Sequence, residues 1–209
     1  MEKSLKIAVL DAGTLGQDID LSVFDKFGRV EVYEKTDRRQ IRFRVADCDV
    51  VIVNKLPLNE ETLGGAKVLK LICVTATGYD NIDLDYCRSK GIGVCNVRGY
   101  SSESVAQVTM AMALSLVNHI KAYNRYVTDG SYTKSGRENN VSPVFHELST
   151  LTWGIIGLGA IGKRVAQMAK GLGFNVIAYN RSIDALYNCV DLDTLCEKSD
   201  VISVHLPLT

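Results

Sequence analysis

Short apolar runs alternate with amphipathic segments along the first hundred residues. Five of the runs have the length and β-branched content of buried strands: Leu5–Leu10, Val30–Tyr33, Val50–Val53, Leu69–Val74 and Ile92–Asn96. Four segments between them are expected to be helical: Leu21–Phe27, Asp37–Arg44, Glu60–Leu63 and Leu84–Ser89. Continuous apolar runs are typical of strands that are covered on both faces. The pattern therefore predicts an α/β unit with a parallel sheet between helical layers.

A longer apolar segment follows this unit. Residues Ser101 to Asn124 are predicted to form one helix, with Ser101 or Ser102 as its N-cap and Glu103 in its first turn. Because its apolar residues lie on more than one face, we expect a helix buried on several sides, between domains or between subunits. The next residues, Thr128 to Glu147, are polar and rich in Gly, Ser and Asn, so they are expected to form a loop.

The alternation of strands and helices resumes at Leu148 and includes a glycine fingerprint. The strand-like run Thr152–Ile156 leads directly into Gly157-Leu158-Gly159-Ala160-Ile161-Gly162, and apolar residues then continue at helical spacing to Leu172. A second strand is expected at Asn175–Tyr179, a helix at Leu192–Lys198 and a third strand at Val201–His205. A fingerprint in this setting predicts the start of a Rossmann-type dinucleotide-binding unit, which usually has six strands. The second unit is therefore expected to be incomplete.

Each part of the fingerprint has a physical role in binding a dinucleotide. Gly157 allows the tight turn out of the strand, Gly159 lets the backbone approach a pyrophosphate, and Gly162 lets the helix pack closely on the sheet. The N–H groups of Ala160 and Ile161 at the start of the helix would face the diphosphate. The alternative is a glycine turn without a ligand, which the flanking elements disfavour.

The second strand of this unit ends without the carboxylate that usually holds the ribose hydroxyls in an NAD site. Tyr179 is followed instead by Asn180, Arg181 and Ser182. Asn180 does not repel a 2′-phosphate, and Arg181 could pair with one. The sequence therefore favours NADP over NAD, with the alternative that Arg181 is a solvated surface charge and either cofactor binds.

Composition narrows the classes of partner. Lys plus Arg number 24 and Asp plus Glu number 24, so a formal net charge of zero gives no reason to expect nucleic acid or an anionic membrane as a partner. No apolar run approaches the ~20 residues of a membrane span, and we expect no signal peptide. The six cysteines form no Cys-x-x-Cys pair, so we expect free thiols in a reducing cytoplasm and no metal site. The histidines, His119, His146 and His205, show no evident carboxylate partner and are expected to be structural.

Further motifs extend over the whole chain in a fixed order: Val53-Asn54-Lys55, Ala76 to Asp83, Gly91 to Val97, Tyr100 to Gln107, Trp153 to Gly162 and His205 to Thr209. With these motifs the chain resembles the D-isomer-specific 2-hydroxyacid dehydrogenases, in particular the glycerate dehydrogenases and hydroxypyruvate reductases. The resemblance implies a flavodoxin-like, substrate-binding lid domain at residues 1–99. It also implies the N-terminal part of an NAD(P)-binding domain at residues 100–209.

The resemblance assigns roles to individual residues. The backbone at Thr77–Gly78 would meet the substrate carboxylate as an anion nest, with Thr77 also near the nicotinamide; the alternative is a bare turn. Asn54 and Lys55 end the third strand, where α/β sheets bind ligands, although Lys55 could simply be solvated. Gln107 would lie near the nicotinamide or be a polar residue of a helix interface. The adenosine side of the cofactor, or a simple strand exit, would be formed by Leu206, Pro207 and Thr209.

The resemblance also implies what the chain does. The family's Arg, Glu and His that carry out catalysis would come after Thr209, so no catalytic residue is assigned here and the 209-residue chain is expected to show little turnover. Steady NADPH oxidation with hydroxypyruvate would contradict this expectation. The implied substrates are small 2-oxo or 2-hydroxy acids, with hydroxypyruvate or glyoxylate first, and the expected assembly is a homodimer through the helix 101–124. The rival hypotheses are a non-catalytic, nucleotide-sensing interaction module and a gene fragment.

Overall fold

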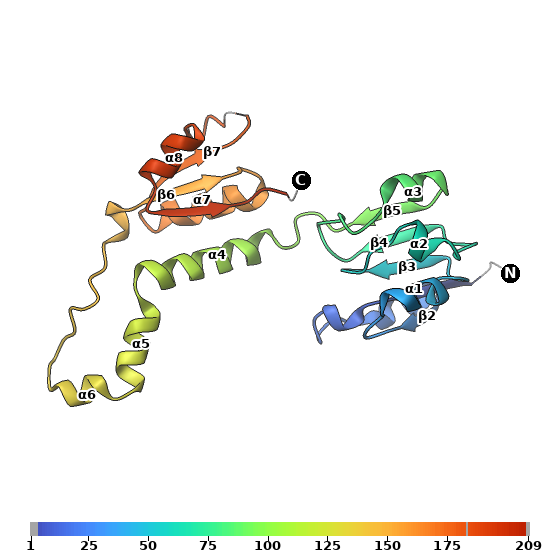
Figure 1. Cartoon of the computed structure of the whole chain (residues 1–209), viewed down its shortest axis with the longest axis horizontal. Coiled ribbons are helices and arrows are strands. Elements are labelled where there is room, and N and C mark those ends of the chain that lie inside the picture. The colour runs from blue at the N-terminus through green and yellow to red at the C-terminus, as the bar shows by residue number, and fades with distance from the viewer. Residues whose placement is uncertain (1–3, 183, 208–209) are drawn as a thin grey trace. The chain divides into compact units, whose positions relative to one another are not determined.

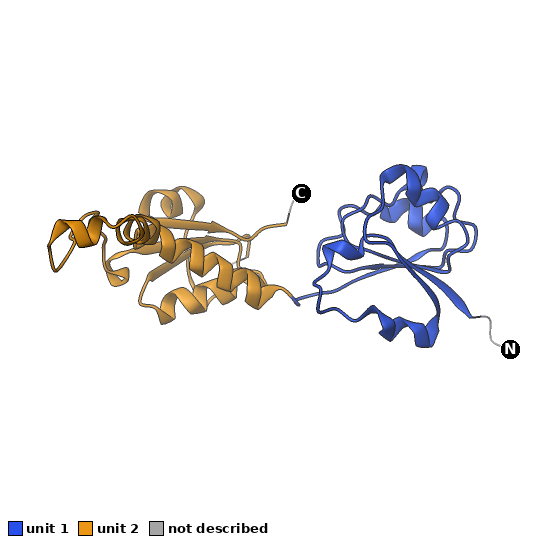
Figure 2. Ribbon diagram, turned by 90° about the horizontal axis from the view of Figure 1, so that it is seen from below, with its two compact units in different colours: residues 1–100 blue, residues 101–209 orange. Residues whose placement is uncertain are grey.

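The computed structural model describes residues 4–182 and 184–207, and the chain divides into two compact units, Met1–Tyr100 and Ser101–Thr209 (Figures 1 and 2). Unit 1 has a five-stranded sheet in the order β2-β1-β3-β4-β5, and every neighbouring pair is parallel. Its strands are β1 (Leu5–Val9), β2 (Gly28–Val32), β3 (Val50–Val53), β4 (Leu71–Val74) and β5 (Gly93–Asn96). This is the flavodoxin-like strand order, so the fold class predicted for this unit is confirmed.

The two faces of this sheet are covered by different kinds of helix (Figure 2). One face carries α1 (Arg38–Arg44), α2 (Glu60–Leu63) and α3 (Leu84–Ser89), which bury Ile41, Leu63 and Cys87 against the strands. The other face carries the 3₁₀ segments η1 (Ala12–Thr14) and η2 (Leu21–Phe27), whose residues Leu21 and Phe24 pack against Ile7 and Ile52. The predicted helix at 21–27 is therefore present, but in the tighter 3₁₀ form.

Unit 2 has a four-stranded parallel sheet in the order β8-β7-β6-β9. Its strands are β6 (Thr152–Ile156), β7 (Asn175–Tyr179), β8 (Asn188–Cys189) and β9 (Val201–Val204). The prediction of three strands was wrong, because β8 has only two residues and no apolar run that could reveal it. The order is that of the first four strands of a Rossmann sheet, so the predicted Rossmann-type class of this unit is confirmed.

Helices lie on both faces of this second sheet. Helix α7 (Ala160–Gly171) buries Val165, Ala166 and Ala169 in a core with Trp153 and Ile155 of β6. Helix α8 (Leu192–Lys198) lies over the opposite face, where a Cβ on Gly154 would come within 2.7 Å of Leu195 Cδ2. Trp153 is completely buried, stacks edge-to-face on Phe174 at 5.1 Å and donates from Nε1 to Ser203 Oγ at 2.9 Å.

The single helix expected at 101–124 is two helices, α4 (Ser102–Val117) and α5 (Ile120–Thr128). His119 breaks the helix, because its φ of 50° is left-handed. The Asn118 side chain ends α4 by donating from Nδ2 to the Leu114 carbonyl at 3.0 Å. Because the break contains neither Gly nor Pro, the apolar pattern gave no sign of it. The expected loop at 128–147 was also partly wrong, since it contains α6 (Ser131–Ser135), and η3 (Leu148–Thr150) follows it.

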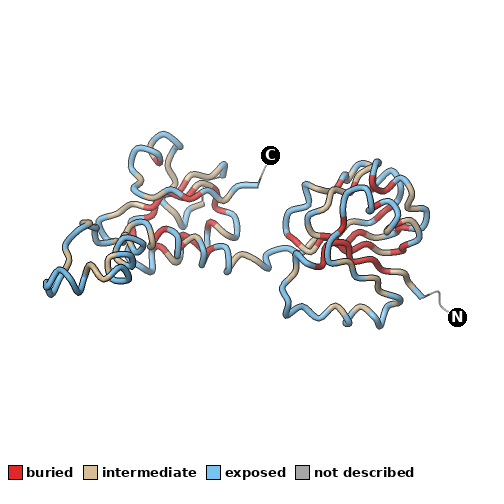
Figure 3. The backbone as a smooth tube through the Cα atoms, turned by 60° about the horizontal axis from the view of Figure 1, so that its bottom comes forward, coloured by how far each residue is buried: buried red, intermediate tan, exposed pale blue. Residues whose placement is uncertain are grey.

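Helix α4 is buried on one face within this chain, whereas the sequence predicted burial on several. Ala106, Met110 and Ala113 are buried in the core that α4 shares with α7, and Arg164 Nε of α7 donates to Glu103 Oε2 at 2.8 Å. The backbone of α4 has exposed positions between its buried ones (Figure 3), and the large apolar residues among them form a second face. It carries Val105, Val108, Met112 and Leu116, which are 38%, 54%, 58% and 75% exposed.

Candidate functional site

Unit 2 has a hollow of about 320 Å³ at the carboxyl ends of β6, β7 and β9. These strand ends meet at one edge of the sheet, which is where open α/β sheets bind their ligands. The residues that line the hollow are Gly157, Gly159, Tyr179, Asn180, Arg181, Ser182, His205, Leu206 and Pro207. Six of the predicted cofactor residues therefore lie together: Gly157, Gly159, Asn180, Arg181, Leu206 and Pro207.

The three glycines of the fingerprint have different surroundings. Gly157 has a φ of 95°, and a Cβ there would lie 2.7 Å from the His205 carbonyl oxygen. A Cβ on Gly162 would lie 1.9 Å from the Gly157 carbonyl oxygen, so a side chain is excluded by backbone. A Cβ on Gly159 would meet no atom within 4 Å. The fold thus requires glycine at 157 and 162, whereas at 159 glycine leaves free space beside the first turn of α7.

The first turn of α7 fits an anionic group. Lys163 N–H donates to the Gly159 carbonyl at 2.9 Å, so the N–H groups of Ala160 and Ile161 precede the first hydrogen bond of the helix. Ala160 is exposed and Ile161 is half-buried. Backbone N–H groups and the dipole of a 12-residue helix favour negative charge at this point. The open space at Gly159 and this helix start match what a dinucleotide pyrophosphate needs.

Asn180 and Arg181 differ in their freedom to meet a ligand. The Asn180 side chain accepts from Leu158 N–H at 3.2 Å and donates from Nδ2 to the Ser182 carbonyl at 2.9 Å. Its amide therefore links the glycine loop to the turn after β7. Arg181 is exposed, and its guanidinium forms no ion pair with any described residue. Arg181 is thus the charged side chain that remains available at this wall of the hollow.

His205 lines the same hollow, although the sequence marked it only as structural. Its Nε2 lies 3.0 Å from Ser203 Oγ, which in turn accepts from Trp153 Nε1 at 2.9 Å. Burial lowers the pKa of His205 below its ordinary value, so the neutral ring is favoured at pH 7. The ring therefore connects the wall of the hollow to the buried Trp153, and it carries no charge there.

In unit 1, the turn after β3 rests on a buried carboxylate. Asp11 Oδ1 accepts from Asn54 N–H at 2.9 Å, and Asp11 Oδ2 accepts from Lys55 N–H at 2.7 Å. The Asn54 side chain donates from Nδ2 to Thr14 Oγ1 at 2.9 Å. The backbone donors of this turn are therefore already used, and the exposed Lys55 side chain is what it offers to an anion. Sequence reasoning missed Asp11, which lies directly after the first strand but far in sequence from both residues that it holds.

In the turn after β4, the strand next to β3, backbone N–H donors are free among the described residues. Thr77 Oγ1 donates to the Val97 carbonyl at 2.8 Å, and Asn96 Nδ2 donates to the Thr77 carbonyl at 2.7 Å. The N–H groups of Thr77 and Gly78 donate to no acceptor in the part of the chain that the structure describes. Asn81, also missed by sequence reasoning, ties the two turns together by donating from Nδ2 to the Leu56 carbonyl at 2.8 Å.

Other predicted residues lie apart from these groups. Gln107 is exposed on α4 and does not line the hollow of unit 2. Thr209 lies outside the described residues. Across the described ranges, no group of three or more His, Cys, Asp or Glu side chains could hold a metal ion. No described helix is long and apolar enough to cross a membrane.

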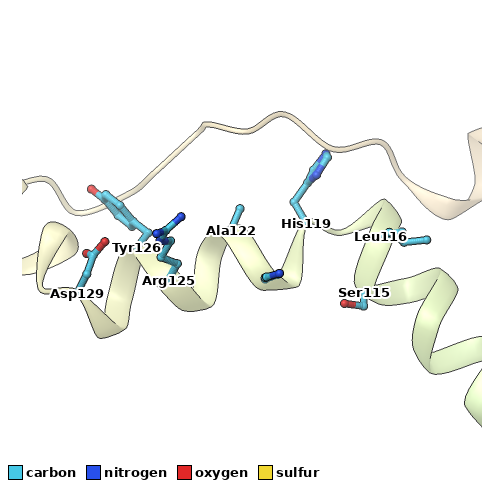
Figure 4. A pocket seen from close by; sticks show the side chains of 8 residues that line it. Ser115, Leu116, His119, Ala122, Arg125, Tyr126 and Asp129 are labelled. Atoms are coloured by element: carbon cyan, nitrogen blue, oxygen red, sulfur yellow. The ribbon is translucent and has the colours of Figure 1, made fainter.

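A second hollow, of about 550 Å³, lies between α4 and α5 (Figure 4). It is lined by Ser115, Leu116, His119, Lys121, Ala122, Arg125, Tyr126 and Asp129. None of these residues was predicted to bind substrate or cofactor.

Comparison with known proteins identifies the family. The profile described as "D-isomer specific 2-hydroxyacid dehydrogenase, catalytic domain" matches residues 7–156. The profile described as "D-isomer specific 2-hydroxyacid dehydrogenase, NAD binding domain" matches residues 110–209. The chain belongs to the D-isomer specific 2-hydroxyacid dehydrogenase family. The resemblance seen in the sequence motifs is thereby confirmed.

Individual relatives cover nearly the whole chain. It is 34% identical to a hydroxypyruvate reductase from Blautia hydrogenotrophica and 33% identical to a glycerate dehydrogenase from Methylorubrum extorquens, with 98% of the chain covered in both. It spans only 66% and 64% of the length of these relatives. A solved D-lactate dehydrogenase from Aquifex aeolicus, complexed with NAD and lactic acid, superposes with a TM-score of 0.80 at 32% identity, covering 98% of this chain and 61% of that one.

Proposed function

We propose that this chain provides the substrate-binding unit, residues 1–100, and the cofactor-binding start, residues 101–209, of an NADP-dependent 2-hydroxyacid dehydrogenase. The observation that carries the proposal is the hollow at the glycine loop. At Gly159 the hollow has free space beside the first turn of α7. At Gly157 and Gly162, backbone atoms lie too close for a side chain. A nicotinamide cofactor, when bound, supplies or accepts the hydride, and the chain's own residues bind and orient the reactants.

The preference for NADP over NAD rests on Arg181. This residue is exposed at the wall of the hollow and has a guanidinium that could pair with a 2′-phosphate in bidentate fashion. The residue before Arg181 is the neutral Asn180, so no negative charge at that position repels the 2′-phosphate. Leu206 and Pro207 would flank the adenosine, and Gln107 and Thr77 would lie near the nicotinamide.

The substrate proposal rests on the two turns of unit 1. The free N–H groups of Thr77 and Gly78 suit a carboxylate, and the exposed Lys55 suits its negative charge. A small 2-oxo acid such as hydroxypyruvate or glyoxylate matches these groups, and the relatives named hydroxypyruvate reductase and glycerate dehydrogenase support that choice. Lys55→Ala should lower the rise in unfolding temperature that hydroxypyruvate produces in the NADPH-loaded chain. Lys67→Ala, which removes an exposed lysine elsewhere in unit 1, is the matched control.

The cofactor proposal is tested by titrating NADPH and NADH into the chain and following nucleotide fluorescence. We expect tighter binding of NADPH. Arg181→Ala should weaken NADPH by about tenfold, roughly 1.4 kcal/mol, and leave NADH nearly unchanged. The matched control is Arg39→Ala, which makes the same change of net charge at an exposed position of unit 1. Equal binding of the two nucleotides, with no effect of Arg181→Ala, would contradict the NADP preference. Failure to bind either would contradict the function.

A homodimer is the proposed assembly. The exposed face of α4 carries Val105, Val108, Met112 and Leu116, and the hollow beside it continues onto α5 (Figure 4). Exposed apolar side chains at this spacing are typical of a helix that packs against a partner. Met112→Asp should convert a dimer to a monomer in sedimentation experiments, and a native chain that sediments as a monomer would contradict the proposal.

The six free thiols are consistent with a reducing cytoplasm, which we propose as the location.

A further inference from the structure

Two cysteines of unit 1 lie side by side on neighbouring strands, and neither is among the residues proposed to bind substrate or cofactor. Cys73 is on β4 and Cys95 is on β5, and they are directly opposite each other in the parallel register. The Cys95 thiol donates to Cys73 Sγ, and the two sulfur atoms are 3.5 Å apart. No other pair of cysteine sulfurs is in contact in the described ranges. This juxtaposition is therefore specific to the β4–β5 pair.

The backbone geometry is compatible with a covalent bond between these sulfurs. Neighbouring strands are ~4.8 Å apart, which is within the ~4.4–6.8 Å that separates the Cα atoms of disulfide-bonded cysteines. A disulfide bond is ~2.05 Å long, so the sulfurs must approach by roughly 1.5 Å. Strand β5 is the outer strand of the sheet, and Cys95 is exposed on it. Its side chain therefore has room to rotate toward Cys73.

The two thiols also differ in accessibility, which sets the order of reaction. Cys95 is exposed, whereas Cys73 is partly buried beside the apolar residues Ile7 and Ile52. Burial, and next the contact with Cys95, raises the pKa of Cys73 to about 12. Since the thiolate is the reacting form, Cys73 is a poor first nucleophile at neutral pH. An oxidant from solution therefore meets Cys95 first.

We propose that Cys73 and Cys95 are a redox-sensitive dithiol, which a low-molecular-weight disulfide converts to a reversible cross-strand disulfide. The Cys95 thiolate attacks one sulfur of the small disulfide, whose S–S bond breaks as the mixed disulfide forms, and one small thiol leaves. The Cys73 thiolate then attacks Cys95 Sγ, and the second small thiol leaves as the protein disulfide forms. The protein loses two electrons and two protons, and the small disulfide is reduced to two thiols.

The experiment treats the native 209-residue chain with oxidised glutathione under conditions where circular dichroism shows it folded. Peptide mapping without reduction should find one peptide pair joined through Cys73 and Cys95. The intact chain should lose the mass of two hydrogen atoms, and dithiothreitol should restore it. Ring closure should become faster by about tenfold for each unit of pH between 7 and 9, because Cys73 must lose its proton. A map in which Cys73 and Cys95 stay free, or carry separate glutathione adducts, would overturn the proposal.

Three variants separate the roles of the two thiols. Cys95→Ser should leave Cys73 unmodified, whereas Cys73→Ser should stop at a stable glutathione adduct on Cys95. Cys196→Ser removes an exposed thiol of α8 and should keep the Cys73–Cys95 bond. If Cys196→Ser abolished the bond, the oxidation would proceed through a different pair and the proposal would be wrong. The map of the native chain decides the outcome even if Cys73→Ser fails to fold.

Discussion

Replacing either of two nearby glycines by alanine should have different effects: one substitution should weaken folding, and the other should weaken cofactor binding. Gly159 and Gly162 are three residues apart at the start of α7, and alanine adds the same single methyl group at each. At Gly162 that methyl would lie 1.9 Å from the Gly157 carbonyl oxygen, whereas at Gly159 it would meet no atom within 4 Å. Gly162→Ala should therefore destabilise unit 2, and Gly159→Ala should leave it folded.

The magnitudes follow from these distances. Ordinary contact begins at 3.4 Å, so α7 must retreat by about 1.5 Å in Gly162→Ala, away from a core that holds Val165 and Ala169. Because the obstacle is backbone, we expect the upper end of overpacking costs, about 3 kcal/mol, which lowers the unfolding midpoint of a unit of this size by roughly 13 °C. Gly159 has φ −71° and ψ −169°, which any residue can adopt. Loss of the glycine N-cap destabilises the folded state, whereas the lower entropy of the unfolded chain with alanine stabilises it, and the two effects nearly cancel, within about 1 kcal/mol.

The assay measures thermal unfolding by circular dichroism and NADPH affinity by fluorescence for both variants. Gly159→Ala should unfold like the native chain and bind NADPH at least about tenfold more weakly, which corresponds to about 1.4 kcal/mol. The methyl would occupy the space that a pyrophosphate needs. Native-like NADPH binding by Gly159→Ala would refute the assignment of this space to the cofactor. A Gly162→Ala chain as stable as the native one would refute the packing argument.

Three further predictions concern other parts of the chain. Asp11→Ala should lower the free energy of unfolding, measured with urea, by about 3 kcal/mol, because two N–H groups of the Asn54–Lys55 turn lose their charged acceptor. An unchanged urea midpoint would contradict this. Burial lowers the pKa of His205, so the unfolded state takes up its proton first, and stability should fall as the pH drops below the ordinary value of 6.5. His205→Asn should flatten that part of the pH profile. A disulfide between Cys73 and Cys95, which are 22 residues apart, should raise the free energy of unfolding by about 3 kcal/mol. A lower unfolding midpoint for the oxidised chain than for the reduced chain would disprove this.

The strands were predictable because their signal is local. Val50–Val53 and Thr152–Ile156 are apolar runs between polar turns, and both strands occupy the predicted residues. The break at His119 was not predictable in this way. It depends on one left-handed residue and on the Asn118 side chain capping α4, and neither alters the apolar pattern. The two-residue strand β8 forms only because it pairs with β7.

The site was predictable where it depends on glycine and less so where it depends on tertiary contacts. Gly157, Gly159 and Gly162 were each given a role from spacing alone, and the structure shows the close contacts at 157 and 162 and the open space at 159. Asp11 was missed, because its partners are 43 and 44 residues away in the sequence. No window of local sequence shows that a carboxylate after the first strand holds the turn after the third.

The two turns of unit 1 offer different chemistry to an anion, and the difference originates with Asp11. Its carboxylate takes the N–H groups of Asn54 and Lys55, so the turn after β3 keeps only a flexible ammonium, which attracts negative charge without fixing its orientation. In the turn after β4 the Asp80 carboxylate lies near Gly78, 3.3 Å from where a Cβ would be, but the N–H groups of Thr77 and Gly78 donate neither to it nor to another acceptor among the described residues. Fixed backbone donors impose direction on a carboxylate. If the chain binds a 2-oxo acid, Lys55 should therefore contribute affinity, while the Thr77–Gly78 turn should determine how the acid is oriented.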